Sequence, residues 1–201
     1  MSTQPISVQK KAVYSGHRDC IYAVEKGSDA SLFFSSSGDG MVVKWQINDP
    51  EAGELIAKMP NSVYALKYVE GKKQLLVGQN FEGLHLIDLE TKKEIRSLKI
   101  TDSYIYDIQV FNNQIFVACG NGEIIIIDGE LFQKIHTIKA SAKSARCMAI
   151  NALVNEFAVG FSDFNIRTYS LADFSLQKEW TAHTNSIFSL QFTPDNKHLV
   201  S

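Results

Sequence analysis

The tetrapeptide Ile21-Tyr22-Ala23-Val24 is followed by four segments of similar residue pattern in this chain of 201 residues. The later copies are Val63-Tyr64-Ala65-Leu66, Ile105-Tyr106-Asp107-Ile108, Cys147-Met148-Ala149-Ile150 and Ile187-Phe188-Ser189-Leu190. The second residues of successive copies stand 42, 42, 42 and 40 positions apart. A period of this size is typical of repeat architectures in which each unit is one supersecondary element.

A second series of residues has the same period further along each unit. Its members stand 42, 40 and 42 positions apart and are Trp45, Ile87, Ile127 and Tyr169. The apolar runs between the two series are short, rich in Val, Ile, Phe and Tyr, and separated by turn sequences such as Gly38-Asp39-Gly40. This pattern indicates strands and hairpins. The continuous run from Ile124 to Ile127 favours a strand that is covered on both faces.

A unit of about 42 residues with four short strands is typical of a propeller blade. We therefore predict an all-β propeller with four-stranded antiparallel blades and almost no helix. In the first blade we expect strands around residues 20–25, 31–37, 41–47 and 54–59. The expected blades are 16–59, 60–100, 101–140 and 141–182, with the start of a fifth at 183–201.

Composition and charge exclude several classes of protein. Hydrophobic residues make up 45% of the chain, enough to bury a core, and the net charge of −2 argues against a nucleic-acid or anionic-membrane partner. No stretch of about 18 consecutive apolar residues is present. We find no motif for a cofactor or a metal ion, so we expect neither.

The three cysteines do not form a pattern of their own. Cys20, Cys119 and Cys147 are odd in number, and no two have the Cys-x-x-Cys spacing. Neither a disulfide framework nor a zinc site is indicated. We interpret them as small buried hydrophobes in a reducing compartment and expect a cytoplasmic protein.

The first unit contains Gly16-His17, then Ser35, Asp39 and Trp45, with 22 residues from His17 to Asp39 and 6 from Asp39 to Trp45. With these residues the chain resembles the WD-repeat β-propeller family. The resemblance implies that His17, Ser35, Asp39 and Trp45 form a hydrogen-bonded structural tetrad, which ties the loop before the blade to two of its strands.

The later units keep the tetrad pattern less completely. Phe81 stands at the Asp position of the second unit, and Lys143 stands near the His position of the fourth. The fifth unit restarts the pattern at Ala182-His183, and the same spacing places its partner serine at Ser201.

The resemblance also implies how the ring closes. Residues 1–15 match the place of an outermost strand, which in this family pairs with the last blade. We therefore expect the chain to be the N-terminal portion of a longer propeller, seven-bladed by family analogy and then roughly 300 residues long.

His17, Asp39 and Ser35 have the residue types of a hydrolase triad. However, Ser35 lacks the Gly-x-Ser-x-Gly context of a nucleophile elbow, and the spacing fits the structural tetrad. We therefore predict no catalytic residue.

The repeated second position of the tetrapeptide carries the functional prediction. The resemblance implies that it lies on the innermost strand near the top mouth of the channel. Its five occupants are Tyr22, Tyr64, Tyr106, Met148 and Phe188. Such side chains are typical of interface hot spots. They are equally compatible with packing between blades.

We therefore predict a non-catalytic scaffold that binds a protein or peptide partner at the top face. Two alternatives stay open. One is an enzymatic or small-ligand propeller with a site in the channel, and the other is a regulatory propeller fused to another domain.

Overall fold

The computed structural model describes residues 7–201, and this part of the chain consists of strands and turns without a helix. Four antiparallel sheets of four strands each follow one another, and a two-stranded sheet comes last. The predicted all-β propeller, with four blades and the start of a fifth, is confirmed. No helix within residues 7–201 is long and apolar enough to cross a membrane.

Each blade is a meander of four strands in chain order. Blade one comprises β1 (Ile21–Lys26), β2 (Leu32–Ser37), β3 (Met41–Gln46) and β4 (Asp49–Lys58). Blade two comprises β5 (Val63–Val69), β6 (Gln74–Gln79), β7 (Gly83–Asp88) and β8 (Lys93–Lys99). Blade three comprises β9 (Ile105–Phe111), β10 (Gln114–Cys119), β11 (Glu123–Asp128) and β12 (Gln133–Lys139). Blade four comprises β13 (Ala145–Asn151), β14 (Glu156–Phe161), β15 (Asn165–Ser170) and β16 (Leu176–Thr181).

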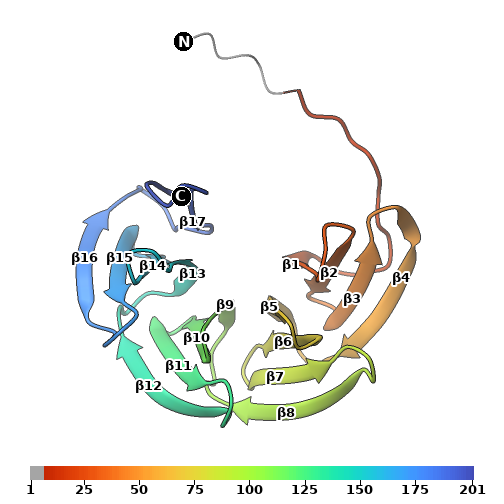
Figure 1. Cartoon of the computed structure of the whole chain (residues 1–201), viewed down its shortest axis with the longest axis horizontal. Coiled ribbons are helices and arrows are strands. Elements are labelled where there is room, and N and C mark those ends of the chain that lie inside the picture. The colour runs from red at the N-terminus through yellow and green to blue at the C-terminus, as the bar shows by residue number, and fades with distance from the viewer. Residues whose placement is uncertain (1–6) are drawn as a thin grey trace.

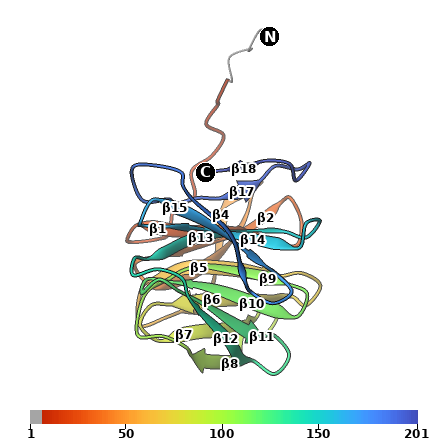
Figure 2. The same cartoon turned by 90° about the vertical axis from the view of Figure 1, so that its left-hand side faces the viewer.

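The blades stand side by side in an arc, with the first strand of each blade innermost and the fourth outermost (Figure 1). Figure 2 shows the same stack of sheets from the side. Blade one follows the expected strands closely, except that β4 begins at Asp49, five residues before the expected start. Its register explains this, because Asp49 pairs with Gln46 and so extends the hairpin to the end of β3.

The core lies between the sheets, so the middle strands of a blade are covered on both faces. The four isoleucines of β11 are all buried. Ile125 and Ile127 pack against blade two, whereas Ile124 and Ile126 pack against blade four. Burial of one such side chain stabilises the fold by roughly 1.5–3 kcal/mol. The continuous apolar run is therefore the consequence of having a neighbour on each side.

The start of blade five is less regular. The strand β17 (Gln191–Phe192) pairs with β18 (Leu199–Val200) through Phe192 and Leu199. Ile187 is buried against blade four, and its carbonyl accepts a weak hydrogen bond from the Cys147 thiol at 3.5 Å. Blade five is thus docked on the fourth sheet even where it has no regular strand.

The expected closing strand is not formed within the described residues. Residues 1–6 lie outside them, and residues 7–15 pair with no strand. The Tyr14 hydroxyl donates instead to the carbonyl of Ile47 at 2.8 Å, and its ring packs on Phe33 and Trp45. The closing strand and the total number of blades stay predictions.

The face-to-face packing predicts the effect of removing a ring from it. Phe116 is fully buried, with its ring centroid 5.0 Å from that of Phe157 in the next blade. Phe116→Ala should lower the free energy of unfolding by roughly 3–5 kcal/mol. Leu131→Ala, at an exposed turn, should change it by about 0.5 kcal/mol or less. Chemical denaturation measures both, and equal effects would contradict the assignment of the core.

Candidate functional site

The structure brings the four residues of the expected tetrad together in blade one. Nδ1 of His17 lies 3.2 Å from Oδ2 of Asp39, and Nε2 of His17 lies 2.8 Å from Oγ of Ser35. The indole N–H of Trp45 donates to the same Ser35 oxygen at 2.7 Å. Together these bonds join the loop before β1 to β2, to the β2–β3 turn and to β3.

Asp39 is held as a carboxylate by this arrangement. Burial favours the neutral acid, but the backbone N–H groups of Arg18 and Met41 and the His17 ring donate to the carboxylate. The net effect is to lower the pKa of Asp39 below its ordinary value. The anion is therefore the stable form and strengthens the joint at neutral pH.

The same geometry is unsuited to nucleophilic catalysis by Ser35. Its residue is only 4% exposed, and its oxygen already accepts the indole proton of Trp45. A nucleophile must reach its substrate and be activated by a neighbouring base. We therefore interpret the four residues as a structural joint.

Two other blades contain parts of this joint. In blade four the Ser141 hydroxyl donates to Oδ2 of Asp163 at 2.7 Å across the same 22-residue spacing. Ser141 thus takes the His position, and the exposed Lys143 lies two residues beyond it. In blade five Nε2 of His183 lies 2.7 Å from Oγ of Ser201, the pair that the spacing predicted.

The first strand of each complete blade has a one-residue β-bulge near its start. The bulged residues lie between paired neighbours and are Tyr22, Tyr64, Tyr106 and Arg146. A bulge leaves its extra residue outside the ladder and redirects the side chain. The repeated position is therefore a structural feature of the strand and not only a pattern in the sequence.

The structure corrects the prediction for blade four. Met148 was expected at the repeated position, but it is 2% exposed and packs in the core between blades three and four. Ala145 pairs with Phe161 as Ile105 pairs with Cys119, so the equivalent of Tyr106 is Arg146. Arg146 follows Tyr106 by 40 residues, whereas the two earlier intervals are 42 residues each. The apolar residues around Met148 continue the sequence pattern and so concealed this shift of two positions.

The bulged side chains meet in one cluster, extended by two rings from neighbouring loops. The Tyr22 and Tyr64 ring centroids are 4.1 Å apart, and Tyr64 stacks on Tyr106 at 5.8 Å. Tyr104 stacks on both Tyr64 and Tyr106, and Phe81 packs on Tyr104 at 4.7 Å. We call this set, with Arg146 and Phe188, the mouth cluster: Tyr22, Tyr64, Phe81, Tyr104, Tyr106, Arg146 and Phe188.

Arg146 connects the aromatic part of the mouth cluster to blade five. Its guanidinium carbon lies 4.2 Å from the Tyr106 ring centroid and 5.1 Å from that of Phe188. Its Nε donates to the Ser162 hydroxyl at 2.8 Å, which fixes the planar group between the two rings. Cation–π contacts of this kind contribute roughly 0.5–2 kcal/mol.

The mouth cluster is only partly buried by its own contacts. Tyr22 is 47% exposed and Phe188 is 70% exposed, whereas Tyr64, Tyr106 and Arg146 are half-buried. Burial, together with a hydrogen bond to Tyr22, raises the pKa of Tyr64 to about 12. The Tyr64 phenol is therefore neutral at physiological pH.

Phe81 has a backbone conformation that is unusual for a large residue. It is exposed in the β6–β7 turn with φ of 67°, in the left-handed region that L side chains with a Cβ rarely adopt. Its N–H donates to the carbonyl of Ser103 at 2.9 Å, which holds the ring against Tyr104.

Three residues of the mouth cluster were not predicted from the sequence as surface residues, namely Phe81, Tyr104 and Arg146. Phe81 was noticed only as an irregular tetrad position, and Tyr104 lies two residues before the repeated one. The interval of 40 residues between Ile87 and Ile127, in the second series, was the signal that could have shifted blade four to Arg146.

The cysteines divide between core and surface. Cys119 and Cys147 are buried, and burial raises the pKa of each thiol to about 12. Cys20 is exposed, contrary to the expectation that all three are buried, because it lies in the loop before β1. Within residues 7–201 no three His, Cys, Asp or Glu side chains gather where they could hold a metal ion.

The repeated four-stranded blades and the tetrad of blade one define a WD-repeat β-propeller. Comparison with known families agrees, because residues 8–46 and 174–201 match the model of the WD domain, G-beta repeat. In these residues the chain is similar to the WD-repeat family.

Two curated relatives align with nearly the whole chain. A WD repeat-containing protein 91 homolog from Dictyostelium discoideum is 24% identical over 97% of this chain and 26% of its own length. The 66 kDa stress protein from Physarum polycephalum is 21% identical over 92% of this chain and 31% of its own length. The chain thus spans about a quarter to a third of these relatives.

The lowered pKa of Asp39 predicts a pH-dependent loss of stability. Asp39→Ala should lower the free energy of unfolding by about 1–3 kcal/mol at pH 7, because His17 and two backbone N–H groups lose their acceptor. A carboxyl whose pKa is lowered by folding stabilises above its unfolded pKa and loses this effect as pH falls through the folded value. The difference from wild type should therefore shrink in acid.

Urea denaturation at several pH values measures this difference. Asp102→Ala is the control, because Asp102 is exposed and forms only a surface ion pair with Lys99. If Asp39→Ala left stability unchanged and removed a hydrolytic activity, the structural interpretation would be wrong.

Proposed function

We propose that this chain acts as a non-catalytic interaction scaffold and that the mouth cluster binds a protein or peptide partner. WD repeats generally mediate protein–protein interaction, and the similarity of this chain to WD-repeat proteins supports the proposal. That the partner binds at the top face, and through the residues of the mouth cluster, is our proposal. The observation that carries it is that the bulged positions of four successive blades, with Phe188 of the fifth, form one continuous and partly exposed surface.

The chemistry of this surface suits a macromolecular partner. Tyr and Arg are enriched among interface hot spots, because they combine large rigid contact area with polar groups at the tip. The rings are already ordered by stacking on one another, so binding orders few additional side chains. A rigid frame that carries such a surface is a common basis of recognition.

The channel alternative predicts different side chains. A catalytic or small-ligand site there requires clustered carboxylates, histidines or arginines. The bulged inner positions carry three tyrosines and one arginine, and the guanidinium of the arginine contacts the rings of Tyr106 and Phe188. This pattern favours the interaction surface.

Removing the exposed rings should abolish partner binding while the blades stay folded. The triple variant Tyr22→Ala/Tyr64→Ala/Tyr106→Ala should lose partners captured from cell lysate, because truncating one hot-spot ring costs about 2 kcal/mol or more. The double variant Tyr22→Ala/Phe188→Ala removes the two exposed rings at the ends of the cluster and carries less risk to folding.

The matched control removes exposed apolar side chains from the outermost strands of three blades, Ile95, Ile135 and Leu176, by substitution with Ala. Capture is compared by quantitative mass spectrometry, and folding by circular dichroism and thermal unfolding. The proposal fails if the triple variant unfolds, which makes the rings part of the core. It also fails if both mouth variants stay folded and capture the same partners as the control.

A further inference from the structure

A cavity of about 490 Å³ opens between blades two and three, at the end of the inner strands opposite the mouth cluster. It is lined by Gln109 and Val110 from the end of β9, whereas the mouth residue Tyr106 lies near the start of the same strand. The volume falls within the roughly 300–1,000 Å³ that is typical of ligand sites. No residue of the mouth cluster lines this cavity.

The junctions between blades differ at three equivalent positions. Between blades one and two these positions hold Phe34, Tyr68 and Leu75, with the first two rings stacked. Between blades three and four they hold Phe116, Ile150 and Phe157, again with two rings in contact. The register makes the positions equivalent, because Tyr68 pairs with Leu75, Val110 with Ile115, and Ile150 with Phe157.

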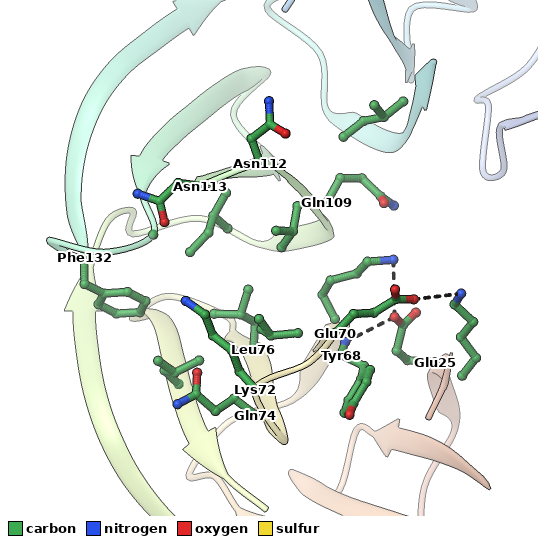
Figure 3. Close-up of a pocket in the computed structure, with 18 residues that line it drawn as sticks. Glu25, Tyr68, Glu70, Lys72, Gln74, Leu76, Gln109, Asn112, Asn113 and Phe132 are labelled. Carbon is green, nitrogen blue, oxygen red and sulfur yellow. Dashed lines mark hydrogen bonds and ion pairs between the residues drawn. The ribbon is translucent and has the colours of Figure 1, made fainter. Parts of the chain in front are cut away.

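The junction between blades two and three has only aliphatic residues at these positions. They are Leu76, Val110 and Ile115, so this junction lacks the two rings that pack at the equivalent positions of the other two. Side chains of neighbouring residues do not close the space. The floor of the cavity is therefore apolar, formed by Leu76, Leu86 and Ile115 with Phe132 at one side (Figure 3).

Polar groups surround this apolar floor. Amide side chains of Gln74, Gln109 and Asn112 line the cavity (Figure 3) and can donate to and accept from a peptide backbone. At one end Glu25 lies 3.2 Å from the Lys67 ammonium and also accepts from the backbone N–H of Tyr68.

The charges at the rim do not balance. Lys67 is neutralised by Glu25, and Lys26 by Glu70 at 3.1 Å. Lys72 has no ion-pair partner within residues 7–201, and Figure 3 shows its side chain beside Gln74 and Leu76 at the cavity. One uncompensated ammonium group thus lies next to an apolar floor.

We propose that this cavity binds an extended peptide segment of a partner protein, with one large apolar side chain on the floor and a neighbouring acidic residue paired with Lys72. The apolar floor selects the side chain, the amides hold the peptide backbone, and the charge of Lys72 selects an acidic neighbour. A hollow of about 600 Å³ between blades one and two offers a contrast. Its lysines Lys44 and Lys73 are both paired, with Glu54 and Glu90.

The test uses a phage-displayed library of random 16-residue peptides, selected on the wild-type chain. Enriched peptides should combine a Leu, Ile, Met or Phe with an Asp or Glu within a few positions. Their dissociation constants are then measured by fluorescence polarisation with synthetic labelled peptides. Binding should weaken as salt is raised, because the Lys72 contact is at the surface.

Two substitutions fill the cavity with the rings that the neighbouring junctions use. Leu76→Phe copies Phe34 and Phe116, and Val110→Tyr copies Tyr68. Each should weaken peptide binding at least tenfold without lowering the thermal midpoint greatly. If one variant misfolds, the other carries the test.

The charge is tested by Lys72→Glu, which should weaken the same peptides at least tenfold. The control is Lys178→Glu, because Lys178 is exposed on the outer strand β16 and has no ion-pair partner within residues 7–201. The Tyr22/Tyr64/Tyr106 triple variant should bind these peptides like wild type, so failure of this proposal and failure of the mouth proposal are distinguishable.

Three results would overturn the proposal. One is a selection without enriched peptides, and another is enriched peptides that bind the folded cavity-filled variants as tightly as wild type. The third is that the enriched peptides contain no acidic residue and bind the Lys72→Glu variant as tightly as wild type. That result indicates a purely apolar ligand.

Discussion

The structure depends on one constraint, which is that every sheet has two apolar faces and each face must be covered by a neighbouring sheet. A single blade of four short strands cannot bury both faces by itself. The four isoleucines of β11 show the solution, since alternate residues of one strand belong to the cores of two different junctions. The period of the sequence is the period of these junctions, and the tetrad of blade one only fixes the loop that leads into the stack.

The binding surfaces that we propose are exceptions to this constraint at opposite ends of the blades. At the mouth, a bulge removes one residue of each inner strand from the ladder, so its side chain is available at the surface. At the other end, a cavity lies at the junction whose three equivalent positions are all aliphatic. Both sites therefore lie at the ends of the inner strands, while the stacked blades provide the rigid frame.

Much of the fold could be predicted from the sequence, because two series of apolar residues with one period define the blades. The tetrad spacing likewise predicted contacts that involve side chains 22 residues apart, and His183 and Ser201 lie as that spacing indicated. The position of Arg146 could not be read in this way. Cys147 and Met148 continue the apolar pattern in a shifted register, and pairing with Phe161 and Gly160 decides the true alignment.

The remaining errors have the same physical origin. Sequence spacing identifies equivalent positions, but exposure depends on what the neighbouring blade places opposite them. Met148 is buried because blade three supplies Phe116 and Ile124 around it, whereas Leu76 lines a cavity together with Val110 and Ile115 of blade three. Neither environment can be predicted from the identity of Met148 or Leu76 alone.

The most direct test of this account is a solution NMR measurement of which blade-four side chain lies at the mouth. The account predicts nuclear Overhauser contacts between the Arg146 side chain and the rings of Tyr106 and Phe188, with ring-current shifts of its δ protons. It also predicts that the Met148 methyl group contacts only core residues such as Phe157. Contacts of the Met148 methyl group with Tyr106 and Phe188, and an unshifted Arg146, would contradict the bulge register on which the mouth cluster depends.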